Sequence, residues 1–196
     1  EYYPFGQDFF PRFLEKLKAA RHYIFMEYFI IGSGVMLDQI LDILKEKVKH
    51  GVVVRIIYDD FGSINAIPPH FIKEMESIGI QTRRFNPYKP MLSVIMNDRD
   101  HRKILVIDGR VAHTGGYNIA DEYINKKIRF GYWKDAGIRV EGECVNSFTT
   151  MFLEMWNYIN KDNAVHDEYL NPHNTFSQSE TVSYTHLRAH ETLRHL

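Results

Sequence analysis

Amphipathic segments alternate with short apolar runs along the first 85 residues of the chain. Apolar side chains recur at helical spacing within 9–20 and 35–49, which predicts two amphipathic helices. The runs at 22–31 and 52–58 are rich in aromatic and β-branched residues and are typical of buried strands. This order of elements predicts an α/β fold in which neighbouring strands run parallel.

The elements that follow complete one domain. A short helix is predicted at 70–78 and a third strand at 80–85. Residues 101–114 indicate a β-hairpin, 131–142 contain a further strand, and apolar positions within 145–160 predict a last helix. A chain of 196 residues is long enough for one domain with a sizeable core.

The hairpin is centred on Asp108-Gly109, which is a strong two-residue turn signal. With this centre, Lys103 is expected opposite Thr114 on the returning strand. Side chains alternate along a strand, so His101 and Lys103 are expected on the same face. The hairpin therefore presents an imidazole and an ammonium group together.

Further polar groups are expected at the histidine's end of the hairpin. Gly115-Gly116 allows the backbone to turn closely there, and Asn118 should emerge near the same place. Imidazole can act as a nucleophile or as a general acid or base near neutral pH, and ammonium and carboxamide groups bind anionic oxygens. Together these groups suit a phosphate ester under attack. Asp108 is an odd number of residues from His101 and Lys103, so it is expected on the opposite face of the strand, and local geometry favours a role in the turn.

The spacing His101-x-Lys103-x4-Asp108 matches the HKD motif of the phospholipase D superfamily, and TGGYN at 114–118 resembles the continuation of that motif. The surrounding phrases MEYFIIGSG, IIYDDFGS, TGGYNIADEYI and GYWKDAGIRVEG are similar to those of bacterial cardiolipin synthases. The resemblance covers roughly residues 1–165. It implies an α/β, phospholipase D-like fold, in which a mixed β-sheet is flanked by helices on both faces.

The resemblance also implies an activity and a set of site residues. It implies a phosphatidyl transferase of the bacterial cell membrane that makes cardiolipin from two phosphatidylglycerol molecules and releases glycerol, without a metal or other cofactor. A phosphatidyl-histidine intermediate would form on His101, although the role of general acid stays open for this residue. Lys103 and Asn118 would hold the non-bridging oxygens, and Asp108 would orient its neighbours in the motif. Asp135 would bond the histidine's second nitrogen, or else form an ordinary ion pair at a strand end.

Family members usually carry two HKD motifs and N-terminal membrane helices. This sequence contains one motif and no run near the ~18 apolar residues of a membrane span. We therefore expect the first half of an active site, completed by a second half or a homodimer partner, and little activity from the chain alone. Expected ligands are phosphatidylglycerol and anionic membrane lipids. The net charge of −1 lacks the basic surplus of a nucleic-acid binder.

The chief alternative is a single-motif phosphodiesterase or nuclease of the same superfamily that acts as a homodimer. The resemblance implies that 1–165 are a phospholipase D-like catalytic half-domain with one HKD motif. The polar composition of 166–180 predicts a linker or the start of an inter-domain segment. Residues 181–196 contain VSYTHLRAHET, the translation of a common sequencing-library adapter, and are interpreted as an artefact tail. The three histidines in this tail are not metal-ligand candidates.

Several other charged or apolar groups leave alternatives open. Glu27 lies inside an apolar strand and either supports the site or forms a structural pair. Asp59-Asp60 is read as strand-end capping in preference to a metal site. The apolar segment 90–96 suits an acyl-chain channel, the bilayer or plain core packing. The cations either meet anionic lipid headgroups or form a solvated face; these are Arg99, Arg102, Lys126 and Lys127.

Overall fold

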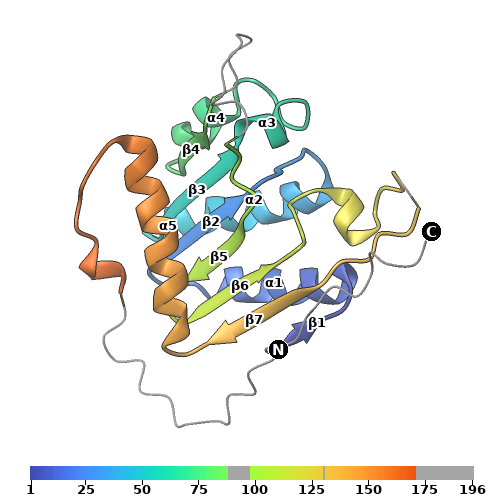
Figure 1. Ribbon diagram of the computed structural model, residues 1–196, viewed down its shortest axis with the longest axis horizontal. Coiled ribbons are helices and arrows are strands. Elements are labelled where there is room, and N and C mark those ends of the chain that lie inside the picture. Colours follow the sequence, from blue (N-terminus) through green and yellow to red (C-terminus); the bar gives the residue numbers. More distant parts are fainter. Residues whose placement is uncertain (88–97, 130, 171–196) are drawn as a thin grey trace, which may run out of the picture.

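The computed structural model describes residues 1–87, 98–129 and 131–170 (Figure 1). In chain order its elements are β1 (Tyr2–Tyr3), α1 (Gly6–Ala19), β2 (Tyr23–Tyr28), α2 (Val35–Lys49), β3 (Val53–Asp59), α3 (Asp60–Ser63), α4 (Phe71–Ser77), β4 (Gln81–Phe85), β5 (Lys103–Ile107), β6 (Val111–Gly115), the 3₁₀ helix η2 (Asp121–Ile124), β7 (Gly137–Glu141), α5 (Cys144–Asn160) and the 3₁₀ helix η3 (Asp167–Tyr169).

The strands form one seven-stranded sheet in the order β1-β7-β6-β5-β2-β3-β4. Strands β2, β3 and β4 run parallel, as the alternation of helices and strands predicts. The remaining pairs are antiparallel, and the β2–β5 pair joins the two parts of the sheet. The expected α/β fold with a mixed sheet is therefore confirmed.

Helices cover both faces of the sheet (Figure 1). The amphipathic helices α1 and α2 pack on one face, where Phe13, Leu17 and Leu44 are fully buried in the larger core. Helix α5 lies across the other face, where Phe152 and Trp156 pack in a second core. Because β2 lies between the two cores, all six of its residues are buried. Its continuous apolar run is thus that of a strand covered on both faces.

The hairpin turn is confirmed, but its predicted register is wrong by one residue. Asp108 and Gly109 have φ of 54° and 62°, and positive φ at both central residues is what a two-residue hairpin turn requires. Arg110 closes the turn by donating its N–H to the carbonyl of Ile107 at 3.0 Å. The ladder, however, pairs Ile107 with Val111, so that Arg110 is an extra residue outside it. Thr114 consequently faces Ile104, and not Lys103.

The chain stays packed on the sheet beyond α5. Tyr169 of η3 lies with its ring centroid 5.0 Å from that of Phe25, and its carbonyl accepts a 2.6 Å hydrogen bond from the Tyr23 hydroxyl. The guanidinium of Arg55 lies 5.0 Å from the Tyr169 ring and 5.0 Å from that of Trp156. The first residues of the segment assigned as a linker are therefore held against the α5 face. Residues 171–196 lie outside the described part of the chain.

A buried histidine without polar partners lies in the core under α1. Both ring nitrogens of His113 are buried and unbonded, and the ring is stacked at 6.3 Å on Tyr3 and lies edge-on to Phe9 and Phe13. Burial lowers the pKa of His113 to about 3, with smaller contributions from nearby positive charges. The folded protein therefore holds this imidazole neutral.

We expect His113 to limit stability in acid. Because its pKa is about 3 in the folded protein and 6.5 when exposed, the unfolded chain takes up a proton first, and stability falls as pH drops below about 6.5. The slope approaches about 1.4 kcal/mol per pH unit. In His113→Leu, the midpoint of acid unfolding followed by circular dichroism should move to lower pH. The exposed His70→Leu is the control, and an equal shift in both variants would contradict this assignment.

Candidate active site

One edge of the sheet gathers the candidate site residues other than Asp108. The parallel strands β2, β3 and β4 end at this edge, and β5 begins there because it runs antiparallel to β2. By the same alternation β6 ends and β7 begins at this edge. The connections at this edge therefore carry Phe29, His101, Asn118 and Asp135 to the same side of the molecule. The predicted clustering follows from the topology.

His101 and Lys103 both lie against the ring of Phe29. The imidazole of His101 is in an exposed residue just before β5, with its centroid 4.8 Å from that of Phe29. The Lys103 ammonium lies 5.3 Å from the same ring and donates a 2.6 Å hydrogen bond to the carbonyl of His101. The two groups thus share one face, as predicted, with the imidazole open to solvent and the ammonium buried.

Burial makes the Lys103 ammonium easier to deprotonate. The residue is 5% exposed, and the cost of burying its charge lowers its pKa to about 8. The negative charges of Asp100 and Asp135 oppose this shift. An anionic group bound beside the ammonium would favour the charged form in the same way. The site is therefore electrostatically suited to an anion.

Asn118 is buried, and most of the hydrogen-bonding capacity of its side chain is used within the protein. Its carboxamide oxygen accepts the N–H of Ile30 at 2.9 Å, and its amide nitrogen donates to the hydroxyl of Tyr123 at 2.7 Å. These bonds fix the loop after β2 to the loop after β6. The amide nitrogen has a second hydrogen, through which it can still donate to an anionic oxygen. Tyr123 is an additional residue of the site that the sequence did not indicate.

Asp135 lies at the edge of the site through the close approach of β6 and β7. A Cβ at Gly116 would meet the Asp135 carboxylate at 1.8 Å, so a side chain at this position would require the carboxylate to move. One carboxylate oxygen accepts the N–H of Ala136 at 2.8 Å. The carboxylate acts electrostatically on Lys103 and Tyr123, whose pKa values it raises. The expected bond between this carboxylate and the ring of His101 is absent from the described contacts.

Asp108 lies at the opposite end of β5 from His101. Its carboxylate accepts three backbone N–H groups at 2.8 Å, from Arg21, His22 and Tyr23. The side chain therefore ties the hairpin turn to the start of β2, as local geometry favours. Its influence on the other motif residues acts through the frame of the sheet.

Buried acids support the site from the α5 side. Asp59 caps α3 by accepting the N–H of Gly62 at 3.0 Å, as expected of a strand-end carboxylate, and it also accepts the N–H of Asp100 at 3.0 Å. Glu27 is fully buried, and one of its oxygens lies 2.6 Å from the Arg102 guanidinium. Arg102 also donates to Asp100 at 3.1 Å. The sequence indicates single acids at these positions, and their meeting beside the motif depends on tertiary structure.

The readings of Arg99 and Arg102 as surface cations are wrong. Arg102 pairs with Glu27 and Asp100, and Arg99 lies 3.6 Å from the buried carboxylate of Asp59 and over the ring of Phe61. Lys126-Lys127 lies on the exposed surface. The apolar segment 90–96 lies outside the described residues.

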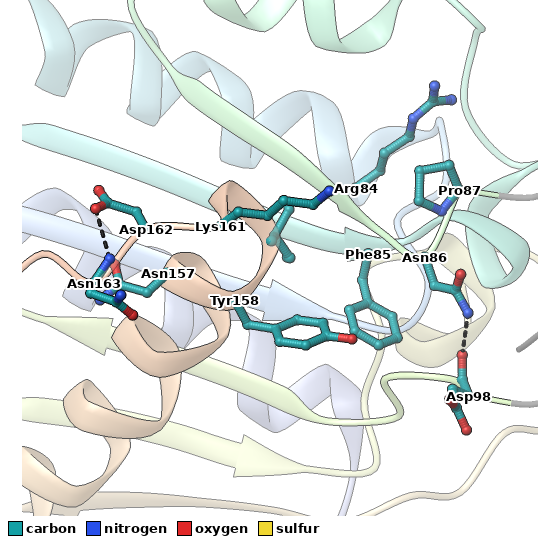
Figure 2. Close-up of a pocket in the computed structure, with 11 residues that line it drawn as sticks. Arg84, Phe85, Asn86, Pro87, Asp98, Asn157, Tyr158, Lys161, Asp162 and Asn163 are labelled. Atoms are coloured by element: carbon teal, nitrogen blue, oxygen red, sulfur yellow. Dashed lines mark hydrogen bonds between the residues drawn. The ribbon is translucent and has the colours of Figure 1, made fainter.

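A cavity of about 650 Å³ lies beside the site on the α5 face. Figure 2 shows it between the end of β4 and the end of α5, where the rings of Phe85 and Tyr158 lie toward one another. Asn86 donates to the carbonyl of Asp98 at 2.9 Å and so joins the chain on the two sides of 88–97. Neither His101 nor Lys103 lines this cavity.

Two further observations concern the described residues alone. Within them, no three His, Cys, Asp or Glu side chains gather so as to hold a metal ion. Across the same ranges, every helix is too short or too polar to span a bilayer.

The fold is that of the phospholipase D family. The crystal structure of the family member Nuc from Salmonella typhimurium matches this chain with a TM-score of 0.54 and 20% identity, over 74% of this chain and 84% of Nuc. The sequence profile of the family described as "Cardiolipin synthase, PLD-like domain" matches residues 13–156. The chain therefore belongs to this family.

Curated relatives match the chain over most of its length. A cardiolipin synthase of Alkalihalophilus pseudofirmus is 40% identical over 168 residues, which cover 85% of this chain and 33% of that protein. An uncharacterized protein of Streptococcus mutans is 50% identical over 161 residues, which cover 82% of this chain and 35% of that protein. The chain thus spans about a third of the length of these relatives.

The Lys103 ammonium should titrate well below the other lysines. Its burial predicts a midpoint near pH 8, whereas exposed lysines titrate near 10.4. The measurement is ¹⁵N NMR of lysine-labelled protein, with Lys103→Arg used to assign the resonance. A midpoint above about 10 would show that the ammonium is solvated, against the arrangement described.

Proposed function

We propose that this chain supplies one half of the active site of a phosphatidyl transferase that makes cardiolipin from two phosphatidylglycerol molecules. The observation that carries the proposal is the exposed imidazole of His101 beside the buried ammonium of Lys103, both against Phe29. A nucleophile next to a fixed positive charge suits attack on a phosphodiester. Membership of the cardiolipin synthase family supports the choice of a phospholipid substrate.

The proposed reaction has two displacements at phosphorus. In the first, a ring nitrogen of His101 attacks the phosphodiester of one phosphatidylglycerol, the bond to the glycerol headgroup breaks, and the glycerol takes a proton from a general acid. This leaves a phosphatidyl-histidine. In the second, a headgroup hydroxyl of another phosphatidylglycerol loses its proton and attacks the same phosphorus. The nitrogen–phosphorus bond breaks, and cardiolipin is released.

The remaining motif residues serve this chemistry in the proposal. The Lys103 ammonium and the second amide hydrogen of Asn118 hold the non-bridging oxygens and stabilise the charge that develops on them. Asp135 would orient the charged imidazole of His101, in the manner of the acid of a catalytic triad. Asp108 fixes the frame of β5 through the start of β2.

The general acid comes from outside this chain in the proposal. The described part of the chain has one HKD histidine, His101, whereas the reaction needs a nucleophile and an acid–base group. A second HKD half in the complete protein, or a homodimer partner, would supply the second imidazole. Because both substrates are lipids, the complete protein would act at the bacterial cell membrane.

A single-unit phosphodiesterase is the second candidate. The observation in its favour is that Nuc, a phospholipase D family member, is matched over 84% of its own length and therefore is about the size of one such unit. Such an enzyme would assemble its site from two copies of the same chain. The near-neutral charge of this chain argues against extended contact with a phosphate backbone.

His101→Ala should abolish transfer in the complete protein. Loss of the nucleophile removes the covalent step, so that conversion of labelled phosphatidylglycerol to cardiolipin should fall by about 10²-fold or more. The matched control is His22→Ala, an exposed histidine at the other edge of the sheet, which should keep wild-type activity. Retention of a tenth or more of the activity by His101→Ala would exclude this role.

The chain alone should make little or no cardiolipin. Its site lacks the general acid, so purified monomer should not convert phosphatidylglycerol above the background of His101→Ala. The measurement is the same lipid assay, together with the mass of the protein in solution by light scattering. Robust cardiolipin formation by a monomer would contradict the half-site proposal, and hydrolysis of phosphodiesters by a dimer would favour the second candidate.

A further inference from the structure

The strand that carries the motif has two faces, and each faces a different environment. Leu105 packs in the core under α1 and α2, whereas Ile104 packs in the core under α5. The same alternation extends to the residues just before β5. His101 and Lys103 therefore lie on the same side of the strand as Leu105, where both contact Phe29, and Arg102 lies on the α5 side with Glu27.

Buried oxygens on the α5 side lack hydrogen-bond donors. The Arg102 Nη2 atom is 2.6 Å from Oε1 of Glu27 but is misaligned, so neither atom makes a hydrogen bond. Oε2 of Glu27 and Oδ2 of Asp100 also have no donor. Glu27 is fully buried and Asp100 is 5% exposed, so water cannot satisfy these atoms at ordinary cost. Two buried carboxylates with unsatisfied oxygens require either another cation or a proton.

We propose that Glu27 and Asp100 share one proton, and that this pair, together with Arg102, fixes the main chain that carries His101. The hydroxyl of protonated Glu27 donates to Oδ2 of Asp100, which satisfies an atom of each residue. Oδ1 of Asp100 stays negative and accepts the backbone N–H and the Nε–H of Arg102 at 3.2 and 3.1 Å. Asp100 is therefore a positioning residue, and its effect on the reaction rests on the proposed function.

The charges around the pair favour the proton. Burial and, after it, the negative charge of Asp100 raise the pKa of Glu27 to about 9, and Arg102 only partly opposes this shift. The third acid nearby, Asp59, accepts the backbone N–H of Asp100 at 3.0 Å and lies 3.6 Å from Arg99. Within this cluster, Glu27, Asp100 and Asp59 thus lie beside the guanidinium groups of Arg102 and Arg99.

The pair also reaches Lys103 on the other face. The charge of Asp100 raises the pKa of Lys103 and so counteracts the burial of that ammonium. Asp100 therefore acts on both active residues of the motif. It holds the main chain at His101 between the Asp59 and Arg102 hydrogen bonds, and it helps to keep Lys103 charged.

The shared proton is tested on this chain with Glu27→Gln and Asp100→Asn. Glu27→Gln should keep the Tm and the Lys103 titration midpoint near wild type, because a neutral amide replaces a neutral acid. Asp100→Asn should lower both, because a negative charge is lost. The matched control is Asp42→Asn on the exposed surface of α2, which should change neither. Equal losses in Glu27→Gln and Asp100→Asn would overturn the shared proton.

A second measurement does not depend on the folding of a variant. In wild-type protein labelled with ¹³C at the glutamate carboxyl, one resonance should remain in its protonated position near neutral pH. That resonance should be absent from Glu27→Gln. If every glutamate instead titrates near 4.3, the proposal is wrong.

The positioning role is tested in the complete protein. Asp100→Asn should lower kcat for cardiolipin formation on the order of 10-fold with a smaller change in KM, because the imidazole is displaced from the phosphorus. Asp42→Asn should keep both values. If Asp100→Asn lowers the Tm and leaves kcat unchanged, the pair stabilises the fold and has no positioning role. Wild-type protein without transfer activity would contradict the proposed function, while the titrations still decide the shared proton.

Discussion

The antiparallel pairing of β2 with β5 is the contact on which the site depends. Strand β2 runs parallel to β3 on one side, so the loops that follow both strands leave from one edge of the sheet. Because β5 runs in the opposite direction, the residues just before it arrive at the same edge. Reversal of β5 would carry His101 to the far side of the molecule and leave Asp108 among the loops. The positions of the motif residues therefore depend on the direction of this one strand pair.

Burial and exposure are divided sharply across this strand. On one face the exposed imidazole of His101 stands beside the buried ammonium of Lys103. On the other face, acids and a guanidinium are removed from water and must satisfy one another, which limits their possible arrangements. Such a network is poorly tolerant of small displacements, so it holds the main chain between the two faces. The site thus combines a rigid support with an open reactive group.

Much of the fold was predictable from local pattern, because each helix and strand has its own periodicity. The turn at Asp108-Gly109 was predictable too, since few residue pairs accept positive φ at both positions. The register was not, because the extra residue Arg110 has no signal of its own. The position of Asp108 followed from strand parity, whereas the meeting of Glu27 with Asp100 depends on residues far apart in sequence. Pairing of buried charges is decided by tertiary contacts, and single-residue reasoning cannot assign it.

The Gly-Gly pair after β6 is fixed by contact with the chain before β7. Gly115 has φ of 150°, and a side chain there would meet the carbonyl of Ala136 at 2.3 Å, while one at Gly116 would meet the carboxylate of Asp135. The Gly-Gly pair, which in sequence resembles a flexible loop, is thus closely packed against Asp135 and Ala136. Positions 116 and 135 are consequently coupled: a side chain added at 116 would displace the Asp135 carboxylate, whereas a smaller residue at 135 would leave room for it.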